Sequence, residues 1–144
     1  MANFIEEVGL MKHSISIFWR LKDNHYKIYV TKCRDCGKAV SLKRLKCPYC
    51  GSRNVEYVES RGFGELINYT VSYYRTEGSE QYLPRVVGLV KLDEGPIIVG
   101  EIVDVDLNEL SIGTRVEAVL RKYSSEDPNG LIYYGLKFIP VIKK

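Results

Sequence analysis

Four cysteines, arranged as two closely spaced pairs, constrain this chain more than any other feature. Cys33 and Cys36 form the first pair, Cys47 and Cys50 form the second, and ten residues separate the pairs. Each pair has the two-residue spacing of a metal knuckle, in which a tight turn brings two sulfurs onto one cation. A glycine follows each pair directly and can adopt the left-handed conformation that such a turn requires. We therefore expect the four cysteines to bind one metal ion.

Zinc is the expected metal, and iron is the alternative. The two Cys-x-x-Cys-Gly segments also look like the knuckles of rubredoxins, but the loop between them is far shorter here, which favours a zinc ribbon. Two disulfides are disfavoured, because a cytosolic setting keeps thiols reduced and paired knuckles favour a metal. Four protein ligands leave the ion no open position for water, so its expected role is structural.

Positive charge is concentrated around the cysteines. Residues 32–53 contain seven basic side chains and one acidic side chain, or +6, whereas the whole chain has a formal net charge of +3, so the remainder sums to −3. Four thiolates around one divalent cation would lower the charge of this segment to about +4. No apolar run approaches the roughly 20 residues that cross a bilayer, and the first residues lack the apolar core of a signal peptide. We expect a cytoplasmic protein without a membrane span.

Residues 14–24 predict a short amphipathic helix near the N-terminus. Apolar residues recur there at helical spacing, and Ser14 can serve as the N-cap. Phe18 and Trp19 lie on the apolar face, where their rings need to be shielded from water. We expect both rings to pack on the protein's own sheet, and the alternative is that they form a docking surface for another chain.

The rest of the chain predicts strands. Residues 26–31 and 55–59 flank the cysteine pairs, and five further extended runs follow, at residues 65–74, 85–92, 96–103, 114–122 and 131–139. Turn residues separate these runs, with a tight hairpin at 93–96, a single helical turn at 106–110 and a turn at 127–130. Five strands of this length predict a small closed barrel of the OB-fold type.

The predicted fold is therefore mainly β, with an N-terminal helical segment over residues 1–25, a zinc ribbon over 26–60 and a five-stranded OB-fold barrel over 61–144. Gly88, Gly100 and Gly135 lie inside predicted strands, where glycine is typical of a bulge or a barrel corner. Tyr69, Tyr73 and Tyr134 alternate with apolar residues, so we expect them on core-facing or half-buried strand faces.

Several motifs together resemble a known family. They are Phe18-Trp19, the two cysteine knuckles, Gly62-x-Gly64, Thr70, Leu92-Asp93-Glu94-Gly95 and Ile112-Gly113-x-x-Val116. Over nearly the whole chain this order resembles the proteins with an N-terminal helix, a rubredoxin-like zinc ribbon and a C-terminal OB-fold that were first catalogued as a domain of unknown function. Members typically accompany thiolases and related acyl-CoA condensing enzymes of lipid metabolism. The resemblance implies a partner subunit that helps to hold or shield the CoA moiety of an acyl-CoA.

Enzyme activity within this chain alone is the weakest hypothesis. His13 and His25 are the only histidines, and no serine, cysteine or carboxylate cluster near them suggests a nucleophile with its base. We expect both histidines to be solvated.

Two binding functions remain. Single-stranded nucleic-acid binding is the alternative function, but residues 60–144 carry ten basic and twelve acidic side chains, and a negative barrel lacks the main source of affinity for a phosphate backbone. Acyl-CoA needs an apolar slot and only a few cations for its phosphates. The preferred function is thus a non-catalytic, acyl-CoA-binding partner of a thiolase-like enzyme, and the candidate ligand contacts are Lys43, Arg44, Lys46, Arg75, Tyr82 and Arg85.

Overall fold

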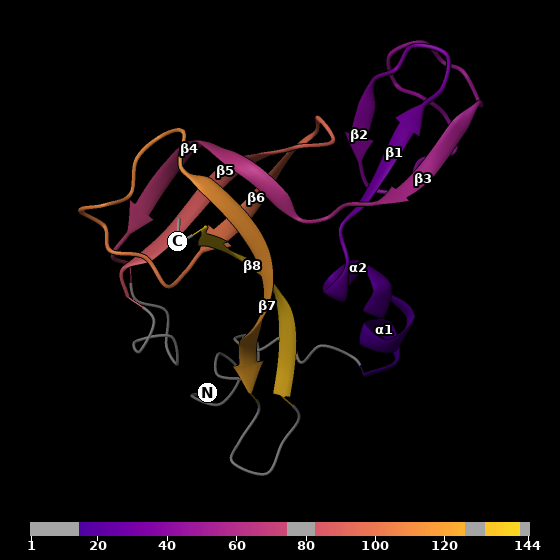
Figure 1. Ribbon diagram of the computed structural model, residues 1–144. Coiled ribbons are helices and arrows are strands. Elements are labelled where there is room, and N and C mark those ends of the chain that lie inside the picture. The colour runs from indigo at the N-terminus through magenta and orange to yellow at the C-terminus, as the bar shows by residue number, and fades with distance from the viewer. Residues whose placement is uncertain (1–14, 75–82, 126–131, 142–144) are drawn as a thin grey trace, which may run out of the picture.

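The computed structural model describes residues 15–74, 83–125 and 132–141, which form two short helices, a three-stranded ribbon and a barrel (Figure 1). The predicted class, mainly β with a zinc ribbon and a five-stranded OB-fold barrel, is confirmed. No helix in the described parts of the chain is both long and apolar enough to span a membrane.

The predicted N-terminal helix is two helices, α1 (Ile15–Arg20) and α2 (Lys22–Tyr26). They are separated at Leu21, whose backbone (φ −99°, ψ 7°) departs from helical geometry. Phe18 of α1 meets the barrel, because its ring lies 5.1 Å from that of Tyr133 in an edge-to-face contact. Trp19 is 66% exposed, so the expectation that both rings pack on the sheet is correct for Phe18 and wrong for Trp19.

The zinc ribbon is an antiparallel sheet with the order β2-β1-β3. It consists of β1 (Tyr29–Cys33), β2 (Ala39–Ser41) and β3 (Val55–Glu59). The predicted strands at 26–31 and 55–59 correspond to β1 and β3, although β1 begins later because α2 extends to Tyr26. The three-residue β2 was not predicted, since so short a strand between two knuckles has no alternating pattern of its own.

The barrel contains the five predicted strands. They are β4 (Phe63–Ser72), β5 (Arg85–Leu92), β6 (Ile97–Ile102), β7 (Arg115–Ser125) and β8 (Ile132–Pro140). The order β4-β5-β6-β8-β7 closes through the pairing of β4 with β7, and β8 meets β6 in parallel at Phe138 and Ile102. This is the Greek-key connectivity of an OB-fold.

The connections agree with the predictions in part. The 93–96 hairpin is confirmed, with the amide of Leu92 donating to the carbonyl of Pro96 at 2.9 Å. Between β6 and β7, however, residues 107–109 form a turn instead of a helical turn over 106–110. The carboxylate of Asp106 accepts from the backbone N–H of Asn108 at 2.9 Å, which favours a turn over continued helix. The predicted turn at 127–130 lies outside the described residues.

The barrel has bulges, but they do not occur at the glycines where they were expected. The register shifts fall between Leu66 and Asn68 in β4 and between Lys122 and Ser124 in β7. Gly88 and Gly100 instead pair directly with each other across β5 and β6, in a regular ladder, and Gly135 of β8 pairs with Arg121 of β7. The missing side chains of Gly88 and Gly100 make room for large residues of the barrel interior, since a Cβ on Gly88 would lie 2.6 Å from Leu66 Cδ1.

The tyrosine predictions also need correction. Tyr69 is half-buried and its hydroxyl donates to the carbonyl of Leu110 at 3.1 Å, as expected of a strand tyrosine. Tyr73 and Tyr134 are exposed. Tyr73 lies beyond the end of β4, and Tyr134 lies where β8 pairs with β7 alone, so neither has a barrel interior to face. Sequence alternation cannot show where a long hairpin leaves its barrel.

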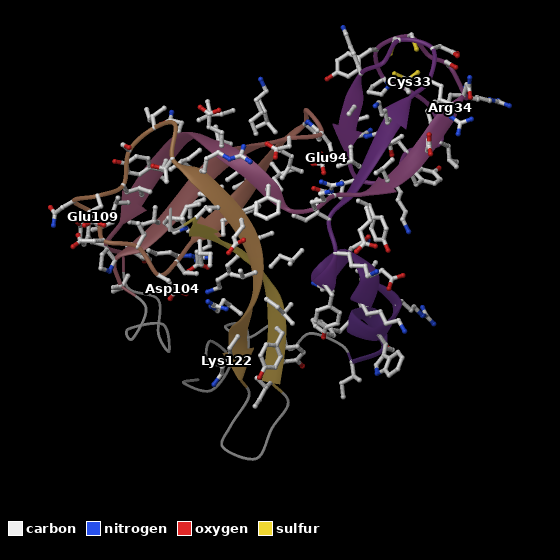
Figure 2. All side chains as sticks on the ribbon, in the orientation of Figure 1. Cys33, Arg34, Glu94, Asp104, Glu109 and Lys122 are labelled. Atoms are coloured by element: carbon white, nitrogen blue, oxygen red, sulfur yellow. The ribbon has the colours of Figure 1, made fainter. Side chains whose placement is uncertain are left out.

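The ribbon and the barrel are in direct contact. Val30 of β1 belongs to the same buried cluster as the barrel residues Leu92 and Val90. Glu94, which Figure 2 labels where the ribbon meets the barrel, accepts hydrogen bonds from Ser60 Oγ at 2.8 Å and from the amide of Arg61 at 3.1 Å. The barrel hairpin therefore holds the chain segment that leaves the ribbon.

Candidate functional sites

The four cysteine sulfurs converge at the end of the ribbon, where Figure 2 labels Cys33. All four lie within 4.8 Å of one another. Cys33 and Cys50 are 3.5 Å apart and Cys36 and Cys47 are 3.6 Å apart, sulfur to sulfur. Four thiolates at about 2.3 Å from a tetrahedral zinc ion would be about 3.8 Å apart, so the donor set fits that ion. The cysteines are positioned to bind a metal, as predicted.

The two knuckles repeat one backbone pattern. The amide of Gly37 donates to the carbonyl of Cys33 at 3.0 Å, and the amide of Gly51 donates to the carbonyl of Cys47 at 2.9 Å. Both glycines have φ +71°, the left-handed conformation expected from the sequence. A residue with a Cβ would be strained at either position. The glycines therefore set the turn that directs each pair of sulfurs inward.

Electrostatics also favours a cation among the sulfurs. Burial opposes ionisation of Cys47, yet hydrogen bonds from the backbone N–H groups of Cys50 and Tyr49 lower the pKa of this thiol to about 7. The backbone N–H of Ser52 lowers the pKa of Cys50, but burial and the three neighbouring sulfurs raise it to about 12. Because like charges this close oppose one another, full ionisation of the set needs a divalent cation.

An acidic side chain that sequence reasoning missed ties the knuckles together. Asp35 lies in the first knuckle and accepts hydrogen bonds from Ser52 Oγ and, at 2.8 Å, from Asn54 Nδ2 beyond the second knuckle. The hydrogen bond from Ser52, followed by that from Asn54, lowers the pKa of the Asp35 carboxyl. The only signal in the sequence was one acid in a basic segment.

The predicted ligand contacts fall into two separate groups. Lys43, Arg44 and Lys46 lie on the ribbon, in the loop that follows β2. Arg85 is the first residue of β5, at the end of the barrel that points away from the ribbon (Figure 1). The structure therefore does not bring the ribbon cations and Arg85 together into one site. Arg75 and Tyr82 lie outside the described residues.

A cavity of about 390 Å³ opens in the barrel wall close to Arg85. Its charged lining includes Lys137 of β8 and Glu101 of β6, whose side chains are only 9% and 13% exposed. Lys137 Nζ lies 3.2 Å from Glu101 Oε2, and Arg85 Nη2 lies 3.5 Å from the same oxygen. Most of the remaining lining is apolar, namely Pro84, Val86, Ile102, Val103, Val105 and Leu107.

The lining of this cavity includes a second ion pair. Arg121 Nη2 donates to Asp104 Oδ2 at 2.8 Å, and Asp104 has a positive φ of 56°. Sequence reasoning missed Glu101, Asp104 and Lys137 as site residues. A signal was present, since Lys137 stands between Leu136 and Phe138 in a strand of the barrel and a charge there is unexpected.

A second cavity, of about 370 Å³, lies between the helices and β8. It is lined by Phe18, Asn24, His25, Tyr133, Tyr134, Gly135 and Leu136. His25 is half-buried and stacks on Phe18, with ring centroids 4.5 Å apart, so the expectation of a solvated histidine is wrong here. The predicted surroundings looked polar because the barrel strand that covers His25 is distant in sequence. His13 lies outside the described residues.

A four-cysteine ribbon joined to a closed five-stranded Greek-key barrel defines a zinc-ribbon and OB-fold protein. Comparison with known families agrees: residues 23–56 match "ChsH2, rubredoxin-like zinc ribbon domain" and residues 57–121 match "ChsH2, C-terminal OB-fold domain". The chain belongs to this ChsH2-type family, also called DUF35, and the resemblance drawn from its motifs is confirmed.

Relatives and a solved structure show the extent of the similarity. A "DUF35 domain-containing scaffold protein" of Pyrococcus furiosus is 40% identical over 129 residues, which cover 90% of this chain and 94% of the relative. The protein of the same name in Methanothermobacter thermautotrophicus is 35% identical, over 85% of this chain and 92% of the relative. The structure named "Ltp2-ChsH2(DUF35) aldolase" has the same fold, with a TM-score of 0.62 and 23% identity over 92% of this chain and 98% of that one.

Proposed function

We propose that this chain is a cytoplasmic, non-catalytic accessory subunit that binds acyl-CoA together with a thiolase or related acyl-CoA condensing enzyme, and that its ribbon holds one structural zinc ion. The scaffold relatives support the accessory role, and the fold is shared with a protein that is named as part of an aldolase.

The observation that carries the ligand proposal is a nearly buried cation in a largely apolar cavity. Lys137 lies in a recess of about 390 Å³ whose walls are mainly aliphatic. Acyl-CoA likewise combines an apolar acyl chain and an uncharged pantetheine arm with charged phosphates. A cation held away from water by apolar walls interacts more strongly with an anion than an exposed lysine does.

The charges around this cavity favour an anion. Arg121, Lys122 and Lys137 line it with Glu101 and Asp104, a balance of +1, and Arg85 adds one more positive charge through its contact with Glu101. The barrel that surrounds the cavity is negative overall, so the positive charge is local. A local cation cluster suits a few phosphates, whereas a nucleic-acid backbone requires a continuous positive groove. Arg75 and Tyr82 remain predicted contributors.

Exposed apolar residues on α1 support the partner half of the proposal. Ile15, Ile17 and Trp19 are all exposed, and the helix has no buried residue. Large exposed apolar patches are typical of protein interaction surfaces. Trp19 is the strongest of these candidates, because tryptophan dominates the binding energy of many interfaces.

Calorimetry with acetyl-CoA tests the ligand proposal, using the zinc-loaded chain alone and then mixed with a thiolase-like enzyme of the same organism. We expect binding that weakens about tenfold in Arg85→Gln, which removes one cation from an exposed position and leaves folding intact. Lys91→Gln is the matched control, because Lys91 is an exposed cation on the same strand but, unlike Arg85, has no ion pair with Glu101. Tight binding of single-stranded DNA at physiological salt, with no effect of acetyl-CoA, would support the nucleic-acid alternative instead.

A further inference from the structure

The ribbon carries a loop, residues 42–46, whose backbone is held in place by a buried threonine. Thr31 of β1 is 1% exposed, and its Oγ1 donates to the carbonyl of Leu42 at 2.6 Å and accepts from the amide of Arg44 at 3.0 Å. Tyr57 of β3 donates from its hydroxyl to the carbonyl of Arg44 at 3.2 Å. The loop therefore lies across one face of the ribbon sheet in a defined conformation, although it has no regular secondary structure.

One residue of this loop is strained. Leu42 has φ +70°, a conformation that is costly for a residue with a branched side chain and that glycine adopts freely. The amide of Leu42 donates to the carbonyl of Tyr29 at 3.0 Å, so the strained backbone is also tied to β1. Strained backbone that the surrounding structure holds in place is concentrated at functional sites.

The loop presents two leucines to water among positive charges. Leu42 is 60% exposed and Leu45 is 84% exposed, so neither contributes much to the protein's own core. Residues 38–49 contain four basic side chains and no acidic one. Exposed apolar residues rimmed by charge of one sign are complementary to an apolar recess rimmed by the opposite sign.

The aromatic rings beside the loop argue against nucleic acid as its ligand. Lys43 Nζ lies 3.9 Å from the ring centroid of Tyr29, and Lys38 Nζ lies 4.7 Å from that of Tyr49. Each lysine covers one face of a tyrosine ring, and a nucleic-acid base would need that face for stacking. Base stacking on aromatic rings is a main sequence-independent contact to single strands. The loop also offers leucines where a nucleic-acid surface uses aromatic residues. These contacts favour a protein partner.

We propose that loop 42–46 is a preformed docking element for a protein whose surface carries an apolar pocket edged by aspartate and glutamate. The thiolase-like enzyme is taken as this partner, so the identity of the partner rests on the proposed function. Because Thr31 and Tyr57 already order the loop, docking loses little conformational entropy, and the leucines can enter the pocket without rearrangement.

Binding of the chain to the immobilised thiolase-like enzyme tests the proposal, measured by surface plasmon resonance at two salt concentrations. Leu42→Gly removes the side chain and relieves the backbone strain, so we expect an unchanged or higher melting temperature together with at least tenfold weaker binding. Leu45→Ser should weaken binding to a similar extent without affecting stability. Arg44→Glu should slow association most at low salt. Val99→Ser is the matched control, since Val99 is an equally exposed aliphatic residue on the barrel.

The outcomes separate this proposal from the proposed function. Loss of binding in both leucine variants, with Val99→Ser unchanged, supports the docking loop. If all loop variants bind the enzyme as tightly as the wild type does, the docking loop is overturned, and the proposed accessory function is unaffected. Absence of wild-type binding overturns both. Binding of single-stranded DNA that depends on Arg44 but not on the two leucines assigns the loop to nucleic acid and also overturns the proposal.

Discussion

The aromatic ring of Phe138 occupies the space that a side chain on Gly100 would fill. These residues lie on β8 and β6, the two strands that meet in parallel to close the barrel, where Phe138 pairs with Ile102. Phe138 is buried in the main core cluster. The contact therefore couples the closure of the barrel to the absence of a side chain at position 100.

We expect Gly100→Ala to destabilise the protein by roughly 1–3 kcal/mol, the usual cost of forcing an extra group into a well-packed core. Urea unfolding followed by circular dichroism measures the change. Val99→Ala, a neighbouring change at an exposed position of β6, should have little effect. Equal stability of Gly100→Ala and the wild type would show that the ring has room to move.

Removal of zinc should unfold residues 26–59, because a three-stranded ribbon of this size has too small a core to fold without its ion. Cys36→Ser should have the same effect by removing one ligand of four. Elemental analysis gives the metal content, and far-UV circular dichroism with thermal melting gives the loss of structure. A chelated protein with an unchanged thermal transition would contradict this prediction. Detection of iron instead of zinc by elemental analysis would show that the predicted metal is wrong.

The nearly buried pair Lys137 and Glu101 should be sensitive to the loss of one partner. Lys137→Ala leaves the Glu101 carboxylate with Arg85 as its remaining ion-pair partner among the described residues. We expect a loss toward the lower end of the roughly 3–5 kcal/mol that follows removal of one member of a buried ion pair. The double variant Lys137→Met/Glu101→Leu should recover most of the stability, since it removes both charges. Chemical denaturation of the three proteins compares them directly, and a double variant no better than the single one would argue against a charge effect.

The ion pair between Asp93 and Arg115 predicts a pH dependence. Arg115 donates from Nη1 to Asp93 Oδ1 at 2.7 Å and from Nη2 to Oδ2 at 2.9 Å. These hydrogen bonds lower the pKa of the Asp93 carboxyl. A carboxyl whose pKa is lower in the folded than in the unfolded protein stabilises folding above its unfolded pKa of about 3.9, and this stabilisation is lost as the pH falls through the folded pKa.

Asp93→Asn should therefore lower the midpoint of urea unfolding at pH 7 slightly and leave it nearly unchanged near pH 2. The effect is small because the Asp93 side chain is 51% exposed and solvent screens the pair. Midpoints measured from pH 2 to pH 7 in both proteins test this. If the difference between the two midpoints increases as the pH falls, the prediction is wrong.

The cysteine site and the barrel strands were predictable because both depend on local sequence. Two residues between cysteines and a glycine after each pair define a knuckle without reference to the rest of the chain. Alternation of apolar residues likewise defines a strand within a few positions. Motifs spread along the chain were sufficient to indicate the family, and the fold that the family implied is the one observed.

Contacts between distant segments were not predictable in this way. The burial of Lys137 beside Glu101, the cavity that His25 lines together with β8, and the hydrogen bonds of Thr31 to the 42–46 loop each join residues that are remote from one another in sequence or belong to different elements. The exposure of Tyr134 had the same cause, since only the pairing of β8 shows where the strand leaves the barrel. Sequence by itself determined the cluster of four cysteines, the strands and the family. Tertiary structure alone decided the cavities, the buried charges and the strained loop, because desolvation and packing depend on every neighbour in space.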